Sequence, residues 1–393
     1  MKLIKSARTV SLVLTLGFFF ACSTSKPSID SLISSNQYDI ALIQIDEQLA
    51  ENPDQPDLLI QKGEINTLIA SEIDVRERTQ FYSEAISAFD SAISLGVDSL
   101  QNEKISTIKD KVWSKEHNAG TASYNNEEEL SDPSITQAHF RNAISIKPGE
   151  TSSHLSLATA LYSSGEIDEA ISTLNVAKNS ADSVPVKVYE NLGFMHLQNG
   201  EPDQSVFYYE LANKDIIQSK NIAFGLVNAY ISTSNTEKAI ELLSNLVDTY
   251  PNDATIRNVY GTQLYLVTET IMNDLANAYL SSDSALVTQI RFEAEGVGEQ
   301  AEKELIQAYS RDTTSTSFVE SLGVFYNNLT AKYLSVNEVA FESDKLLLLA
   351  KAETLLNFAI EYYEKLSLLT PDSSELNTTL EGLNSLKQSR FSS

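Results

Sequence analysis

The 393-residue sequence has a single cysteine, Cys22, and a single tryptophan. One cysteine excludes a disulfide framework within the chain and leaves a cysteine-based metal site without ligands. Proline (9 residues) and glycine (14 residues) are also scarce, whereas hydrophobic residues make up 42% of the chain. Because proline and glycine interrupt helices, this composition favours a folded, helix-rich protein over a disordered one.

Basic residues are few, with 28 lysines and arginines against 54 aspartates and glutamates, and the formal net charge is −26. A surface this acidic repels phosphate backbones, so nucleic acid is not expected as a partner. It would attract basic proteins or divalent ions, although diffuse acidity is also an ordinary means of staying soluble.

Long apolar runs are absent except at the amino terminus. Lys2, Lys5 and Arg8 precede an apolar stretch at 10–20. That stretch is shorter than the ~20 residues of a membrane-spanning helix, and a basic segment followed by a short apolar one is typical of a secretory signal. The rest of the chain is therefore expected to lie outside the bilayer.

A repeat is present between residues 151 and 251. Small and large residues recur there at a spacing of 34 to 35 positions. The recurring sets are Ala158 and Gly193; Ala170, Ser205 and Ala239; and Leu174, Tyr209 and Leu243. This period is typical of stacked helical hairpins, each of which needs neighbours to bury its apolar face.

The sequence also predicts how these hairpins pack. Small residues such as Gly193 should lie where two helix backbones approach closely, with large residues filling the gaps. Gly165 and Gly200 should adopt the left-handed conformation that ends the first helix of each hairpin.

Outside this region the hairpins are predicted to be larger. Extra residues fall near 74–78 and 125–133, and a further insertion follows 274, with a helix break expected at 296–298. Leu59, Gly63 and Ile69 are expected to face inward, and Ile93 is expected in the core. A long helix at 345–369 and a polar capping helix at 374–388 should close the array.

From about residue 31 to 371, and most strongly over 151–253, the chain resembles tetratricopeptide-repeat (TPR) proteins. Ala21-Cys22 resembles the lipobox of bacterial lipoproteins, although Phe19 and Phe20 depart from the usual residues. Together these features resemble a bacterial TPR-domain lipoprotein. The fold implied is an all-α, TPR-like α-solenoid of antiparallel helical hairpins, enlarged toward the carboxyl terminus.

The lipoprotein resemblance implies cleavage before Cys22 and lipidation of its sulfur. The domains would then be a signal peptide at 1–21, a lipidated tether at 22–30 and a helical repeat domain at 31–393. Ser23 after the cysteine implies sorting to the outer membrane. The alternative is an ordinary secretory signal with an incidental cysteine.

TPR proteins are adaptors that hold peptides or protein domains in a groove lined by first helices. The resemblance implies a protein or peptide partner and no cofactor, and the acidic composition favours a basic partner. Half-exposed positions on the first helices are the candidate groove residues, unless they are ordinary surface positions. They are Phe194, Gln198, Asn228, Ile231, Thr262, Tyr265, Asn327 and Asn328. The lysine and arginine clamp of some TPR proteins is not expected, because cations are few there.

Catalytic and metal-binding motifs are lacking. The four histidines, His117, His139, His154 and His196, are dispersed, although His154 and His196 fall on neighbouring first helices. Residues 127–129 are acidic and read as a solvated loop. The prediction is a non-enzymatic envelope scaffold. The alternatives are a hydrolase hidden after Asp274, and a solute-capturing lipoprotein that works with an outer-membrane transporter and whose ligand lobe would begin at 274–299.

Overall fold

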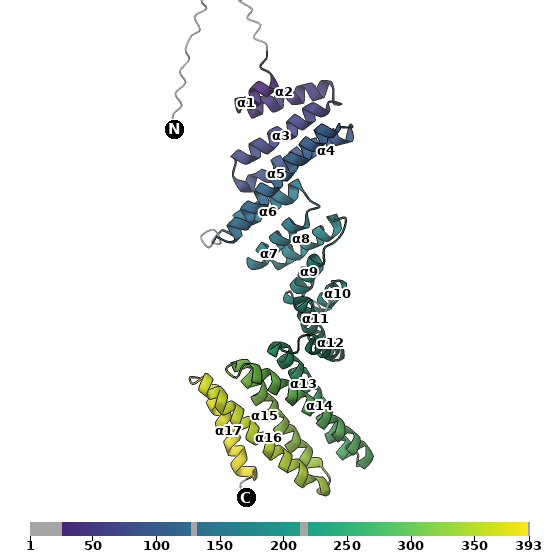
Figure 1. The fold of residues 1–393 in the computed structure, drawn as a ribbon, viewed down its shortest axis with the longest axis vertical. Coiled ribbons are helices and arrows are strands. Elements are labelled where there is room, and N and C mark those ends of the chain that lie inside the picture. Colours follow the sequence, from purple (N-terminus) through teal and green to yellow (C-terminus); the bar gives the residue numbers. More distant parts are fainter. Residues whose placement is uncertain (1–25, 127–131, 213–218, 392–393) are drawn as a thin grey trace, which may run out of the picture. The chain divides into compact units, whose positions relative to one another are not determined.

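The structure is a computed structural model that describes residues 26–126, 132–212 and 219–391. Within these ranges every regular element is a helix (Figure 1). The all-α class is thereby confirmed, as is the arrangement in antiparallel helical hairpins of the TPR-like kind. The helices form two compact units that divide between Lys147 and Pro148.

The first unit contains the predicted partial hairpin and two larger ones. Its elements are α1 (Ile29–Ser34), α2 (Tyr38–Glu51), α3 (Pro56–Glu72), the 3₁₀ helix η1 (Val75–Glu77), α4 (Arg78–Ser94), α5 (Ser99–Tyr124) and α6 (Pro133–Ile146). Helix α3 packs on α4, and α5 packs on α6. The extra residues near 74–78 form η1 at the tip of the α3–α4 hairpin.

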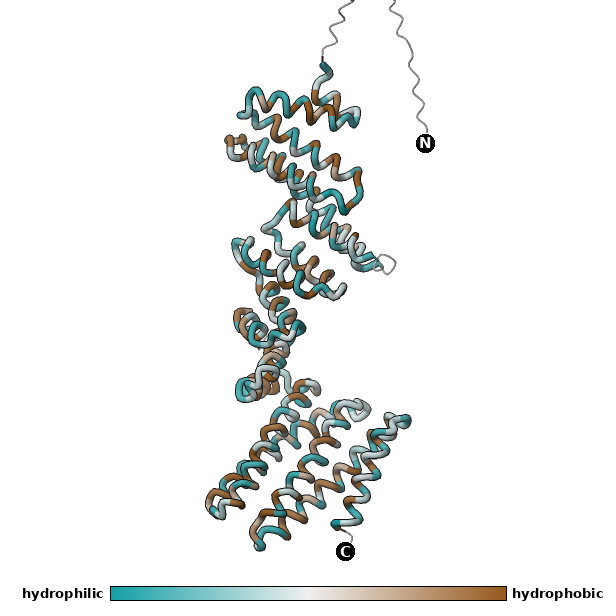
Figure 2. Tube along the Cα trace, turned by 180° about the vertical axis from the view of Figure 1, so that it is seen from behind, coloured by the Kyte–Doolittle hydropathy of each residue, from teal (hydrophilic) through white to brown (hydrophobic). Residues whose placement is uncertain are grey.

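The second unit contains five hairpins and a terminal helix. Its elements are α7 (Thr151–Ser163), α8 (Ile167–Ser180), α9 (Val186–Gln198), α10 (Pro202–Leu211), α11 (Lys220–Ser232), α12 (Thr236–Thr249), α13 (Ala254–Leu280), α14 (Ser284–Arg311), α15 (Thr316–Val339), α16 (Glu342–Leu369) and α17 (Ser374–Phe391). Figure 2 shows hydrophobic and hydrophilic segments alternating along these helices. Such alternation gives each helix one apolar side for its neighbours.

A large side chain from the second helix fills the space over a small residue on the first. A Cβ atom added to Gly193 would lie 2.8 Å from the Tyr209 ring, and one added to Gly120 would lie 2.8 Å from the Phe140 ring. Phe89 lies against Gly63 in the same way. The predicted small positions therefore are sites of close approach, and what approaches them is mostly an aromatic ring.

The turns that follow the first helices contain residues in the left-handed conformation. Gly165 has φ of +83° and Gly200 has φ of +76°, as predicted for residues that end the first helices. Ser234 takes the equivalent place after α11, with φ of +57°. A left-handed serine is less favourable than a glycine, so this turn is held by its flanking helices.

The predicted helix break at 296–298 is wrong. Helix α14 runs without interruption from Ser284 to Arg311. A Cβ on Gly298 would lie 3.3 Å from Thr268 of α13, so this glycine serves helix packing. Glycine in a helix interior costs only about 1 kcal/mol, which packing against α13 can offset. The extra residues lengthen both helices of this hairpin.

One position in the first unit differs from its predicted burial. Ile93 is 41% exposed and is not part of the core, because Ala92 takes the inward position at the end of α4. Gly63 is buried as expected, and Leu59 and Ile69 are half-buried and pack against the hydrophobic core. The spacing of hydrophobic residues predicts the buried side of a helix with an error of about one residue, because the apolar side is about 100° wide and adjacent residues are about 100° apart.

Helix α17 closes the second unit as predicted. It packs on α16 and buries Leu376 and Leu383, while most of its other side chains are exposed. An array end needs one apolar side toward its neighbour and a polar side toward water.

Gly193→Ala should lower the free energy of unfolding by about 1–3 kcal/mol, because the new methyl group meets the Tyr209 ring. Gly296→Ala is the matched control: nothing lies within 4 Å of its added Cβ. That substitution should stabilise α14 by roughly 0.5–1 kcal/mol. Urea denaturation of both variants measures the difference, and equal midpoints would contradict the packing described here.

Candidate functional site

The first helices α7, α9 and α11 of the second unit are successive neighbours. Three of the predicted groove residues, Phe194, Gln198 and Asn228, are exposed on α9 and α11. We call these three residues the first-helix surface. Phe194 is 37% exposed, and its ring meets Tyr162 of α7 edge-to-face with 5.2 Å between centroids. An aromatic ring held by another ring is a rigid contact point.

Two further predicted residues are half-buried. Ile231 of α11 packs against the hydrophobic core of the unit. Thr262 of α13 donates a hydrogen bond to the Asn258 carbonyl oxygen at 2.8 Å. Their side chains thus support their own helices as well as lying near the surface.

The structure brings Tyr265 and Asn328 together. Tyr265 of α13 is only 5% exposed, and its hydroxyl accepts a hydrogen bond of 2.6 Å from the Asn328 amide of α15. The Tyr265 ring also packs edge-to-face on Phe325. Asn327 donates to the Asn328 side-chain oxygen at 3.4 Å. These polar groups join α13 to α15, which leaves them less available to a ligand than their sequence positions suggest.

A buried polar cluster lies in the first unit. The Glu116 carboxylate of α5 is fully buried and bonds with Tyr82 at 2.7 Å, Arg78 at 2.9 Å and His139 at 2.6 Å. Burial alone would raise the pKa of Glu116, but hydrogen bonds from His139, Tyr82 and Arg78 outweigh it and lower the pKa. Burial and the Glu116 charge raise the pKa of Tyr82. The cluster joins α4, α5 and α6.

A similar pair lies in the second unit. Arg257 of α13 and Glu304 of α14 form a buried ion pair, and Arg257 also donates to the Pro251 carbonyl oxygen at 2.9 Å. Arg78 donates to the Ile73 carbonyl oxygen at 3.0 Å in the same manner. Each arginine bonds with a backbone carbonyl a few residues before it in the sequence and with a carboxylate on the following helix. These contacts hold the helices together, which is a structural role.

The histidines occupy separate surroundings. His154 of α7 is buried, and neither ring nitrogen has a hydrogen-bond partner within the described part of the chain. His196 of α9 stacks on Tyr208 and bonds with Glu201 at 2.5 Å. No group of three or more metal-ligating side chains occurs in the described ranges. His154 and His196 therefore have different local roles.

Two predicted features lie outside the described residues: the lipidation site Cys22 and the acidic segment 127–129. Among the helices that the structure does describe, none combines the length and the apolar character that a bilayer crossing requires.

No protein-family model matches the sequence, and no curated protein matches it. Several solved helical-repeat structures are similar. One comes from a functional study of pilF of Pseudomonas aeruginosa, with 13% identity, a TM-score of 0.45 and coverage of 70% of this chain and 99% of that one. Another is YrrB, described as a TPR protein with an unusual peptide-binding site, with 17% identity, a TM-score of 0.39 and coverage of 62% and 97%.

A third is the C-terminal part of a TPR repeat-containing protein from Cytophaga hutchinsonii, with 14% identity, a TM-score of 0.34 and coverage of 75% of this chain and 98% of that one. Similarity at this level assigns neither a family nor an activity to the chain.

Sequence reasoning did not find Tyr162 or the Glu116 cluster. Tyr162 could have been found from the repeat, since it lies 35 residues before Leu197 on the next first helix. Glu116 bonds with Arg78, which lies 38 positions earlier in the preceding hairpin, and its own enlarged hairpin does not follow the repeat. No short-range pattern reports such a contact.

The buried His154 should make the stability depend on pH. Burial lowers its pKa below the ordinary 6.5, so below pH 6.5 the unfolded chain binds the proton and the folded chain does not. Stability should therefore fall as the pH drops from 6.5, by up to about 1.4 kcal/mol per pH unit.

His154→Leu should remove this part of the pH dependence, because leucine cannot take up a proton. The free energy of unfolding is measured by urea denaturation of both chains between about pH 5 and 7. This range lies above the pH at which Glu116 takes up its proton. An unchanged slope in the variant would show that His154 protonates equally well in the folded chain.

Proposed function

We propose that this chain is a non-enzymatic scaffold of the cell envelope, anchored by a lipid on Cys22, that binds another envelope protein through the first-helix surface. The observation that carries the proposal is the exposed Phe194 ring, held in place by Tyr162, with Gln198 exposed one turn further along α9 and Asn228 exposed at the equivalent position of α11. A fixed aromatic ring together with exposed hydrogen-bonding amides suits an extended peptide or a protein loop.

The regularity of the helices supports this proposal. Because α7, α9 and α11 are equivalent helices in successive hairpins, their exposed positions recur in register. Phe194 and Asn228 are 34 residues apart and occupy the same position in the repeat. A partner segment lying across these helices would contact one side chain from each. Several weak contacts of this kind together give specific binding.

Charge supports a basic partner. Loss of the first 21 residues would remove Lys2, Lys5 and Arg8 from a net charge of −26 and leave −29. A field of this sign accelerates the approach of a basic protein and disfavours an acidic one.

The anchor is inferred from the amino-terminal sequence. Residues 23–28 separate Cys22 from the start of α1 at Ile29, and a chain of that length reaches at most about 25 Å. The first helix would therefore stay close to the lipid surface. Ser23 favours placement at the outer membrane under the lipoprotein resemblance.

The solute-capturing alternative has no observation in its favour. Residues 274–299, where a ligand lobe would begin, lie in the α13–α14 hairpin and form part of the helical array.

Phe194→Ala should weaken partner capture by roughly fivefold or more, because the variant removes the ring at the centre of the surface. Phe207→Ala is the matched control, since Phe207 is 52% exposed on the second helix α10. The wild-type chain and the two variants are each immobilised and incubated with an envelope extract. The measurement is the amount of the protein that the wild type binds in stoichiometric quantity. Equal loss in both variants, or in neither, would refute the proposed surface.

Cys22→Ala should release the protein from membranes, because it removes the acylated sulfur, and none of the described helices is long and apolar enough to cross a bilayer. Fractionation of membranes and soluble extract measures the distribution, with Ser25→Ala as the control in the same segment. Membrane retention of the Cys22 variant at the level of the control would rule out the lipid anchor.

A further inference from the structure

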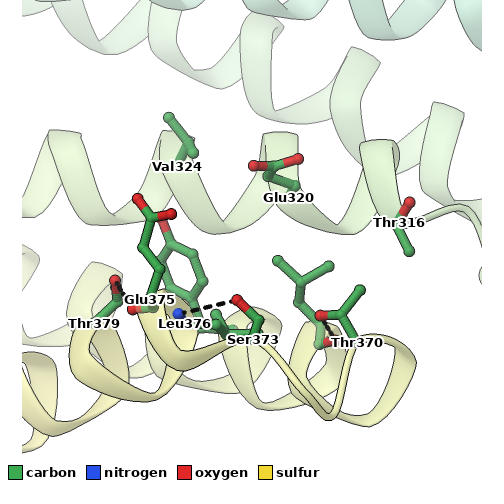
Figure 3. Close-up of a pocket in the computed structure, with 10 residues that line it drawn as sticks. Thr316, Glu320, Val324, Thr370, Ser373, Glu375, Leu376 and Thr379 are labelled. Carbon is green, nitrogen blue, oxygen red and sulfur yellow. Dashed lines mark hydrogen bonds between the residues drawn. The ribbon is translucent and has the colours of Figure 1, made fainter.

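A cleft of about 470 Å³ lies at the carboxyl-terminal end of the second unit, between α15, α16 and α17. Figure 3 shows Glu320 and Val324 on one wall, which belongs to α15, and Glu375 and Leu376 on the other, which belongs to α17. Leu366 and Tyr363 of α16 complete the lining. We call it the terminal cleft. None of the eight predicted groove residues lines it.

The terminal cleft offers negative charge without a counter-charge. Glu320 and Glu375 carry its two carboxylates, and its lining includes no lysine, arginine or histidine. Neither carboxylate is joined to a basic side chain among the described residues, in contrast to Glu116 and Glu304. Two carboxylates facing one space repel each other, and a cation between them relieves that repulsion.

The hydroxyl groups in the cleft also present acceptors. Thr370 donates its proton to the Leu366 carbonyl oxygen at 2.9 Å, and Thr379 donates to the Glu375 carbonyl oxygen at 3.0 Å. Each oxygen still has a free lone pair. Such oxygens can receive hydrogen bonds from a ligand, but they have no proton left to donate.

Tyr363 gives an independent indication of a ligand. It is 8% exposed, lines the cleft and rests its ring on Gly323 of α15. Its hydroxyl has no hydrogen-bond partner among the described residues, unlike the hydroxyls of Tyr326 and Tyr265. Burial, and then the Glu320 charge, raise the pKa of Tyr363, so the hydroxyl stays neutral. The buried ring thus holds a hydroxyl without a protein partner at the wall of the cleft, where a ligand or water can complete its hydrogen bonds.

Apolar groups limit the kind of cation. Val324, Leu366 and Leu376 line the cleft together with the two carboxylates. A hydrated metal ion gains nothing from these side chains, whereas a methylene chain buries apolar area against them. The volume accommodates an aliphatic chain together with an ammonium head.

We propose that the terminal cleft binds an alkylammonium group, carried by a lysine side chain of a peptide or by a free polyamine. The ammonium lies between Glu320 and Glu375, where its three protons meet the carboxylates and the Tyr363 hydroxyl. Its methylene chain lies on Val324, Leu366 and Leu376. The ligand class follows from the cleft alone and does not depend on the first-helix surface.

The test is an NMR titration of the purified full chain, labelled at leucine and valine methyl groups. The probes are an acetylated, amidated peptide with a central lysine, the same peptide with norleucine, and spermidine. The lysine peptide should shift the methyl signals of Val324, Leu366 and Leu376, and the norleucine peptide should bind roughly tenfold more weakly. Equal binding of the two peptides, or no shift with any probe, would overturn the proposal.

The charge requirement is tested with Glu320→Gln/Glu375→Gln, which should weaken binding of the lysine peptide by roughly tenfold. Glu293→Gln/Glu381→Gln removes the same charge from exposed positions outside the cleft and should leave binding unchanged. Equal effects of the two double variants would mean that net charge alone attracts the probe, and the cleft would be excluded.

Tyr363→Phe keeps the ring on Gly323 and removes only the hydroxyl, so it should weaken binding by about threefold at an unchanged melting temperature. It also serves as the test if the double variant loses structure. The spermidine arm identifies the source: tighter binding of spermidine than of the lysine peptide assigns the cleft to free polyamines, and the reverse assigns it to peptides.

Discussion

The contact between a large side chain and a glycine in the facing helix is the constraint on which the hairpins depend. Helices approach closely where one of them carries a small residue, and where that residue is glycine the space is filled by a side chain such as Phe89 or Tyr209. Tyr209 meets two glycines, Gly193 in its own hairpin and Gly225 in the next. One ring thus fixes both the closure of a hairpin and its stacking on a neighbour.

Buried ion pairs appear where the repeat is least regular. Glu116 lies in the enlarged α5–α6 hairpin, and Glu304 lies in the long α13–α14 hairpin. Each carboxylate is bound by an arginine that also holds the chain before a helix. A polar pair with fixed hydrogen-bond geometry specifies one arrangement where apolar packing alone would allow several.

The regular hairpins and the functional candidates occupy different positions. Packing accounts for most of the residues that recur at 34 to 35 positions, so recurrence by itself does not indicate binding. The first-helix surface consists of side chains left over after packing, and the terminal cleft forms where α17 takes the place of a further hairpin. An array that ends in a single helix leaves polar and charged groups facing a space that another helix pair would have filled.

The sequence by itself determined the helical hairpins from α7 to α12, their glycine turns and the small residues at close approaches, because each depends on spacing within one repeat. It also predicted the capping helix. Only the tertiary structure decided that α14 is unbroken, that Tyr265 bonds with Asn328, and that Glu320, Tyr363 and Glu375 line one cleft. These outcomes depend on contacts between segments far apart in the sequence, up to 63 residues for Tyr265 and Asn328, which are set by helix length and register and leave no local pattern in the chain.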